Sequence, residues 1–393
     1  MLELIELFQS DDYAVTFACS ASDSDFMFDL SSIKVNKALI KLNCESFNSF
    51  LAELQPHLVL FDRFMIEEQF GWRVEQTCPQ AMRLLDTEDL HCLRYARHQA
   101  LKEEREMTYH DLLSSEMAKR EVASILRCDL TLMISHVEIQ ILQDVFKVDS
   151  KLIIHLPFLL DKISQENAQW PSYAEREHFL SIGNFRHAPN WDAVLYLKQT
   201  IWPLIRKQLP KSEMHIYGSY APKKATQLHK PAEGFHVLGR AEDAQVVMRQ
   251  ARICLAPIRF GAGIKGKLVE AMICGTPSIT TSVGAESMHD ELEWNGCIED
   301  DPQAFADAAV KIYQDEKTWS ECQAKGINII NQCYNKEAHS KRFLETFNKA
   351  LNKLEENRLN NFTGALLRNH SMRSTEFMSR WIELKNKACD TTS

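Results

Sequence analysis

Two series of short apolar runs, each alternating with helical patterns, constrain the fold more than any other feature of this sequence. In the first half, we predict strands buried on both faces at 13–19, 57–62, 81–86, 130–135 and 151–156. The segments between them carry apolar residues at helical spacing, as at 46–55 and 91–107. Apolar strands separated by amphipathic helices are typical of a parallel sheet covered by helices.

The pattern stops in the segment 157–173, which holds two prolines and no clear period, and we interpret this segment as a linker. It then restarts, with strands predicted at 179–184, 214–218, 235–239, 252–258 and 276–281, and helices at 188–205, 241–250, 266–274 and 301–316. We therefore predict an α/β fold of two doubly wound Rossmann-like domains that face each other across a cleft. The predicted parts are residues 1–160, 161–335, a helix at 336–360 and a partly helical tail at 361–393.

The tail carries one isolated amphipathic patch. It is formed by Phe377, Met378, Trp381, Ile382 and Leu384. Such a patch docks on the body of the protein or binds a partner, and we favour docking.

Composition excludes several classes of protein. Of the 393 residues, 45% are hydrophobic and 25% are charged, which suits two or three soluble domains. The net charge of −9 argues against a nucleic-acid partner. The 11 cysteines show no CxxC or zinc-type spacing, which favours free thiols in a reducing compartment. The acidic amphipathic start is not a signal peptide, so we expect a cytoplasmic protein; peripheral membrane contact stays open.

The segment 259–280, RFGAGIKGKLVEAMICGTPSIT, combines a glycine turn with two cations. A strand is predicted to end before Gly261 and Gly263, and a helix to begin near Ile264. Glycine lets a ligand approach the backbone, and helix N-termini attract anions. With Lys265 and Lys267 at the same place, phosphate or diphosphate is the natural ligand.

Glu270 lies one helical turn further along, where a carboxylate can accept hydrogen bonds from the hydroxyls of a ribose. The segment therefore predicts a nucleotide-diphosphate site. The competing interpretation is a plain turn between strand and helix with solvated lysines, because a GxG motif alone is weak evidence.

Over a longer stretch, from Phe179 to about Ser287, the chain resembles the donor domain of the GT-B glycosyltransferases of family 4, the group 1 type. The resemblance rests on SIGNFRHAPNWDAV, IWPLIRKQLP, MHIYG, FHVLGRAED and the segment ARICLAPIRFGAGIKGKLVEAMICGTPSITTSVGAE. The first half fits more loosely, through LRCDLTLMISHVEIQIL and RLLDTEDLHCLRYAR.

The resemblance implies roles for individual residues on the donor side. Glu270 matches the second glutamate of the family's E-x7-E motif, which holds the donor ribose. The remaining donor-binding positions are Gly261 with Gly263 and Ile264 at the diphosphate turn, Lys265 and Lys267 beside it, Gly239 and Arg240 at the base, and Gly183 at the first strand end.

On the acceptor side, the resemblance places His91 and Asp89, or Asp86, near the reaction centre. We take His91 and Asp89 as the candidate catalytic residues. A histidine at a helix start is also commonly a structural residue, and this interpretation stays open.

The chain departs from the family pattern at three points. The first glutamate of E-x7-E is replaced by Ala262, and the usual basic pair after Gly183 is absent, with Asn184 and Pro189 in its place. The chain also begins with LELIELFQ, which has helical spacing, where the family has a strand and a glycine-rich loop. We therefore expect a gap in the amino-terminal sheet and a weakened active site unless an upstream segment completes it.

The resulting hypothesis is a retaining, metal-independent hexosyltransferase. Its donor would be a nucleotide-diphosphate sugar of the UDP or GDP type, with no further cofactor. Its acceptor would be a polysaccharide, a lipid or another glycan precursor. Two alternatives remain: a nucleotide-sugar epimerase of the same fold, and a non-catalytic nucleotide-sugar-binding or scaffold protein.

Overall fold

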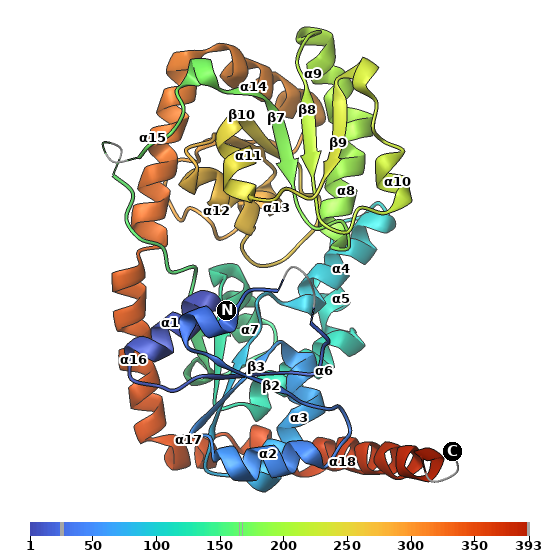
Figure 1. The fold of residues 1–393 in the computed structure, drawn as a ribbon, viewed down its shortest axis with the longest axis vertical. Helices are drawn as coiled ribbons and strands as arrows, with labels where there is room; N and C mark the ends of the chain where they lie inside the picture. The colour runs from blue at the N-terminus through green and yellow to red at the C-terminus, as the bar shows by residue number, and fades with distance from the viewer. Residues whose placement is uncertain (24–26, 165, 167, 391–393) are drawn as a thin grey trace.

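The computed structural model contains two α/β domains stacked along its long axis, with helices α15 and α16 running along one side (Figure 1). It describes residues 1–23, 27–164, 166 and 168–390. The chain passes from the first domain to the second after β6 and returns near residue 334, where Leu160 and Asn335 form a parallel bridge. Two crossings therefore connect the domains.

The second domain is built on one sheet of six parallel strands, in the order β12-β11-β10-β7-β8-β9. Strand order reverses between β7 and β10, which are neighbours, as in a doubly wound fold. All five strands predicted in this half are present. The bounds are β7 Glu177–Ile182, β8 Met214–Tyr217, β9 Phe235–Gly239, β10 Ala251–Ala256, β11 Ser278–Thr280 and β12 Gly296–Ile298.

Helices cover both faces of this sheet. Trp202, Ile205 and Phe305 pack on one face, and Leu268, Met272 and Ile329 belong to the core on the other side. The helices are α8 Ala188–Tyr196, α9 Trp202–Gln208, α10 Lys223–Thr226, α11 Ala244–Gln250, α12 Gly266–Ile273, α13 Ser282–Ala285, α14 Pro302–Gln314 and α15 Glu316–Cys333. A π-helical turn at Leu197–Ile201 joins α8 to α9, so the predicted helix 188–205 is nearly continuous.

The first domain has a four-stranded parallel sheet in the order β3-β4-β5-β6, and a separate parallel pair β1-β2. The strand predicted at 13–19 was wrongly expected to be buried on both faces: β1 is half-buried and pairs only with β2, outside the main sheet. The bounds are β1 Thr16–Cys19, β2 Asn36–Leu39, β3 Leu58–Asp62, β4 Met82–Asp86, β5 Leu130–Met133 and β6 Ile153–His155.

Helices from both ends of the chain cover this sheet. Phe8 of α1 packs against Phe343 and Phe347 of α16, beside the buried strand residues Leu84 and Leu130. The first residues are helical, as predicted, and the pair β1-β2 is separate from the sheet β3–β6. The helices are α1 Leu2–Ser10, α2 Ser46–Leu54, α3 Phe64–Thr77, α4 His91–Lys102, α5 Tyr109–Leu113, α6 Glu116–Arg127, α7 His136–Asp144, α16 Lys336–Asn352, α17 Leu354–Asn360 and α18 Phe362–Asp390.

The tail forms the long helix α18, which lies across α3 and α6 at the bottom of the molecule (Figure 1). It docks through Met372 and Ser379, which are buried. The predicted patch is not the docking face, because Phe377, Met378, Trp381 and Leu384 are all exposed.

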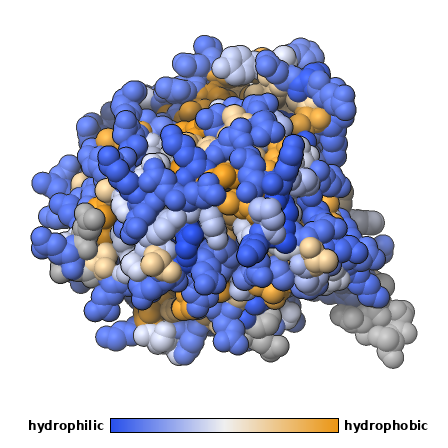
Figure 2. Space-filling view, turned by 90° about the horizontal axis from the view of Figure 1, so that it is seen from above, coloured by the Kyte–Doolittle hydropathy of each residue, from blue (hydrophilic) through white to orange (hydrophobic). Residues whose placement is uncertain are grey.

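The face at the end of the second domain is mostly hydrophilic, with apolar side chains in small groups (Figure 2). Among the described residues, no helix has both the length and the apolar character needed to cross a membrane. The ten cysteines whose state is described are free thiols, six of them buried.

Candidate functional site

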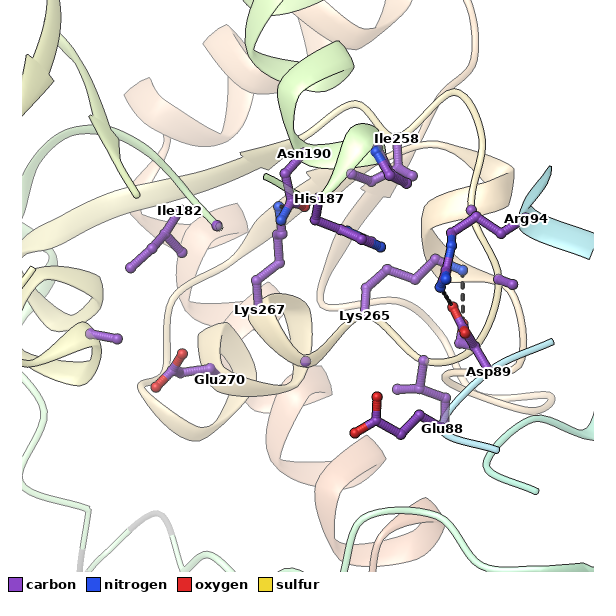
Figure 3. Close-up of a pocket in the computed structure, with 18 residues that line it drawn as sticks. Glu88, Asp89, Arg94, Ile182, His187, Asn190, Ile258, Lys265, Lys267 and Glu270 are labelled. Atoms are coloured by element: carbon purple, nitrogen blue, oxygen red, sulfur yellow. Dashed lines mark hydrogen bonds and ion pairs between the residues drawn. The ribbon is translucent and has the colours of Figure 1, made fainter. Parts of the chain in front are cut away.

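A cavity of about 460 Å³ opens where the order of the second sheet reverses (Figure 3). Its walls include Ile182 and Gly183 at the end of β7, Ile258 after β10 and the start of α12, which begins at Gly266. The carboxyl ends of strands at such a reversal form the crevice in which doubly wound folds bind ligands. Glu88, Asp89 and Arg94 of the first domain close the cavity from the other side.

Lys267 is held at the end of β7. Its Nζ donates a hydrogen bond to Asn190 Oδ1 at 2.8 Å. Gly183 makes this position possible, because a Cβ there would lie 2.6 Å from Asn190 Nδ2 and 2.9 Å from Lys267 Nζ. Burial leaves the Lys267 ammonium group poorly solvated and thereby lowers its pKa to about 8. An anionic ligand would stabilise the charged form.

The glycine turn meets the first domain directly. Gly263 has φ +63°, and a Cβ there would lie 2.8 Å from Cβ of Asp89, so both the backbone and the close approach require glycine. The Gly263 N–H donates to Glu138 Oε1 of α7 at 2.6 Å. The Gly263 amide, which the resemblance assigned to a diphosphate, therefore already binds a carboxylate of the other domain.

The helix after the turn begins at Gly266, as the predicted helix 266–274 does, and two residues after the start near Ile264 that was inferred from the glycine turn. Lys265 is the N-cap of α12. The first N–H groups of a helix have no partner within it, so those of Gly266 and Lys267 lie at the positive end of α12, beside the cavity. The backbone N–H groups available to an anion are therefore those at the start of α12, because the Gly263 N–H of the turn already binds Glu138.

Lys265 sits between the two domains. Its Nζ donates to the Gly263 carbonyl at 2.9 Å. Burial lowers the pKa of Lys265, while Glu286 and Glu138 partly offset that effect. Burial raises the pKa of Glu138 in turn. A cation and two carboxylates thus meet behind the glycine turn.

Asp89 lines the cavity and His91 lies behind it. Arg94 forms an ion pair with one Asp89 oxygen, and His91 Nε2 lies 3.4 Å from the other. Burial lowers the pKa of His91 to about 4, so the ring is neutral near pH 7. Of the two candidate catalytic residues, only Asp89 is among the residues that line the cavity.

The other predicted residues divide into two groups. Gly261, Ile264 and Glu270 line the cavity, and the Glu270 carboxylate has no hydrogen-bond partner among the described residues. Burial, with a smaller contribution from Asp243, raises the pKa of Glu270. Gly239 ends β9 with φ +78°, and neither it nor Arg240 lines the cavity.

Comparison with known proteins identifies the second domain. Residues 176–315 match the family model described as glycosyl transferases group 1. This segment is a group 1 glycosyltransferase domain. A rice protein (Oryza sativa subsp. japonica) named probable sucrose-phosphate synthase 2 is 35% identical over 79 residues, which are 20% of this chain and 8% of that protein. The match thus spans less than a tenth of that relative.

Solved structures share the arrangement of most of the chain, which is the GT-B fold. The sucrose-phosphate synthase of Thermosynechococcus elongatus superposes with a TM-score of 0.65 at 17% identity, over 88% of this chain and 90% of that one. HepE of Anabaena, in complex with UDP and glucose, gives 0.61 at 12% identity over 88% and 95%. TarM of S. aureus, in a complex that contains UDP, gives 0.59 at 14% identity over 77% and 58%.

Several residues of the glycosyltransferase cavity were missed from the sequence. Asn190 and His187 come from the start of α8, and Arg94 from α4. The contact of Glu138 with the other domain was also missed. Glu138 lies three residues after the N-cap Ser135, where a carboxylate normally forms a capping box. No local pattern signals that its side chain instead reaches a glycine 125 residues away.

A second contact also ties the glycosyltransferase domain to the first domain. Arg97 of α4 pairs with both oxygens of Glu286 and donates to the Gly261 carbonyl at 2.8 Å. Ser287 Oγ accepts the N–H of Val137 at 3.0 Å. The glycine turn is therefore held from the first domain at two separate places.

Proposed function

We propose that this protein transfers a sugar from a nucleotide-diphosphate sugar to an acceptor hydroxyl. The observation that carries the proposal is the cavity at the strand reversal of a group 1 glycosyltransferase domain. It combines the partly desolvated Lys267, the start of α12 and the unpaired Glu270, and a carboxylate of the other domain closes it.

The donor would lie along the carboxyl ends of the second sheet. Its diphosphate would contact the start of α12, Lys265 and Lys267, and its ribose would bind Glu270. The base would extend toward Gly239 and Arg240 at the end of β9. The donors to test first are UDP sugars, because HepE and TarM were solved with UDP; GDP sugars follow.

In the proposed reaction, the acceptor oxygen bonds to the anomeric carbon while the bond from that carbon to the diphosphate breaks, and the proton of the acceptor hydroxyl passes to the leaving diphosphate oxygen. Negative charge grows on the leaving diphosphate, where the lysines and the helix start are already in place. We propose retention of configuration, transfer of a hexosyl group and no metal at this step. Asp89 would face the reacting sugar, and His91 would position Asp89 from behind.

Donor turnover with a panel of acceptors tests the proposal. Purified protein is incubated with UDP and GDP sugars, with and without polysaccharide, lipid and small glycan acceptors, and products are identified by mass spectrometry. A transferase releases nucleoside diphosphate and forms a heavier acceptor only when both substrates are present. Conversion of the donor sugar alone would instead identify an epimerase.

The control is the variant Lys267→Ala in the same assay. Binding of nucleotide sugars without any turnover in the panel would favour the non-catalytic binding or scaffold alternative. Turnover that survives the substitution unchanged would remove the cavity from the reaction and overturn the proposal.

A further inference from the structure

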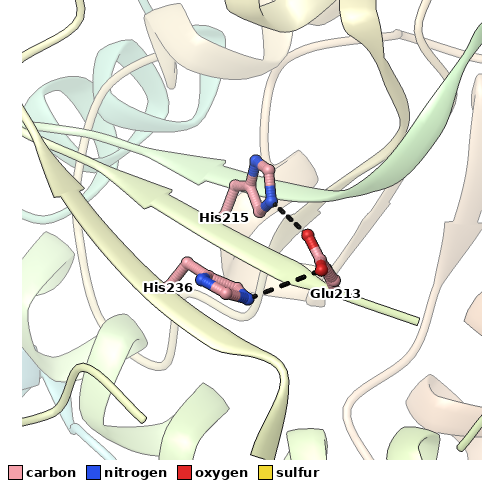
Figure 4. Close-up of side chains that lie close together, drawn as sticks. All are labelled: Glu213, His215 and His236. Carbon is pink, nitrogen blue, oxygen red and sulfur yellow. Dashed lines mark hydrogen bonds and ion pairs between the residues drawn. The ribbon is translucent and has the colours of Figure 1, made fainter. Parts of the chain in front are cut away.

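We propose that Glu213, His215 and His236 form a binding site for a zinc-class transition metal ion. Figure 4 shows the Glu213 carboxylate facing both imidazole rings. One carboxylate oxygen and one ring nitrogen from each histidine lie within 4.8 Å of one another. A glutamate with two histidines is a known zinc ligand set, with the fourth position left for water.

The register of the sheet brings these residues together. His215 of β8 and His236 of β9 are directly opposite each other, so their side chains stand on the same face of the sheet. Glu213 precedes His215 by two residues, which places it on that face as well. The cluster lies near the beginnings of these parallel strands, whereas the glycosyltransferase cavity lies beyond their ends.

The distances fit ligands of one ion. Glu213 Oε2 lies 2.9 Å from His215 Nε2, a hydrogen bond that an ion would replace, and Oε1 lies 3.8 Å from His236 Nε2. Ligands of a tetrahedral zinc ion, with bonds of about 2.0–2.1 Å, are separated by about 3.3 Å. The observed values lie on both sides of that separation, and His236 Nε2 is a buried nitrogen without a hydrogen-bond partner among the described residues.

The surroundings hold the ligands in place and leave the site open. The ring of His178 stacks on His215 with centroids 3.8 Å apart. The Glu213 side chain is 52% exposed, which leaves an entry path for the ion.

An ion at this position would join β8 to β9, which is the edge strand of the sheet. It would therefore stabilise the domain rather than take part in sugar transfer. The inference does not depend on the proposed transferase activity.

The test titrates the untagged, chelator-treated full chain with Zn²⁺ and with Co²⁺. We expect one ion per chain, a visible tetrahedral Co²⁺ spectrum without thiolate charge-transfer bands, and a melting temperature that rises with Zn²⁺ concentration. His236→Gln and Glu213→Gln should each weaken binding at least about a hundredfold. His229→Gln, which alters a neighbouring ring 5.7 Å from His236, is the matched control and should bind normally.

Melting curves without metal show whether each variant folds, and Glu213→Gln, at a largely exposed position, is the change that packing tolerates best. Equal Zn²⁺ affinity in the parent, His236→Gln and Glu213→Gln proteins would overturn the proposal. A thiolate spectrum, or no saturable binding by the parent protein, would overturn it as well. UDP affinity should be the same with and without Zn²⁺.

Discussion

The two domains differ in how their parallel strands are joined into sheets. The glycosyltransferase domain has all six strands in one sheet, whereas the first domain has four strands in one sheet and β1 and β2 as a separate pair. Leu39, the last residue of β2, is 70% exposed, and Leu42 is 46% exposed. In the six-stranded sheet, Leu238 of the edge strand β9 is 42% exposed, so both domains leave apolar side chains in water where a strand lacks a neighbour.

The difference also explains how each domain contributes to the cavity. The second sheet reverses its strand order between β7 and β10, which opens a crevice at that point. The four strands of the first sheet follow one another in order, so no reversal occurs among them. That domain therefore supplies a loop with Asp89 and the carboxylate of Glu138, which approach a crevice built by the other domain.

The strongest test of this division removes both cavity lysines. Lys265→Ala with Lys267→Ala should lower UDP affinity roughly a hundredfold to ten-thousandfold, because each charge-assisted contact contributes about 1.5–3 kcal/mol. Uridine, which lacks phosphate, should bind the variant nearly as well as the parent. Calorimetric titration measures both ligands, and Lys211→Ala, three residues before the start of β8 and so at the other end of the strands from the cavity, is the control. Equal losses for UDP and uridine would contradict the assignment.

Asp89→Asn separates chemistry from donor binding. Turnover should fall about a hundredfold or more because Asp89 is proposed to face the reacting sugar. UDP affinity should change by less than about threefold because Asp89 belongs to the first domain, outside the proposed donor contacts. Initial rates with the best acceptor and calorimetry on the same sample measure the two effects. The control is Asp192→Asn, which breaks another aspartate–arginine pair outside the cavity. Parallel losses of rate and affinity would show that Asp89 belongs to the donor site.

Glu270→Gln tests the ribose contact. An amide fills nearly the same volume but cannot form a charge-assisted hydrogen bond, so UDP affinity should fall roughly tenfold to a hundredfold. The melting temperature should stay unchanged, since the Glu270 carboxylate has no partner to lose among the described residues. If neither quantity changes, Glu270 is a solvated helix residue and the donor assignment loses much of its support.

The smallest expected effect is a pH dependence of UDP binding. The pKa of Lys267 is lowered to about 8, so the free protein loses this cation as the pH rises above 8. Diphosphate binding needs the protonated form, so UDP affinity should fall about tenfold between pH 7 and pH 9. The variant Lys267→Ala should show a weaker dependence over that range. A flat profile for the parent protein would mean that Lys267 does not contact the diphosphate.

The strands and the donor turn were predictable because their signals are local. Apolar runs such as 252–258 predict strands from local sequence alone, and GAGIKGK carries its turn and both lysines within seven residues. The helical spacing of 266–274 gave the observed start of α12, whereas the start near Ile264 was two residues early because Lys265 takes the N-cap position.

Other features depend on distant partners. The contact between Glu138 and Gly263 requires both domains to be in place, and no spacing in the sequence reveals it. The prediction of the docking face of α18 was wrong for a related reason. Met372 and Ser379 are a weaker signal in the sequence than Trp381, yet they are the residues buried where α18 packs on α3 and α6. Apolar character alone does not show which side of a helix finds a surface.

The packing of α1 on α16 has a consequence for synthesis on the ribosome. Phe8 emerges early, but its partners Phe343 and Phe347 emerge more than three hundred residues later. The core of the first domain therefore stays incomplete until translation is nearly finished, while the second domain already has all six of its strands. A nascent chain of this kind exposes apolar surface for a long time, so we expect it to depend on chaperones during translation and to tolerate carboxyl-terminal truncation poorly.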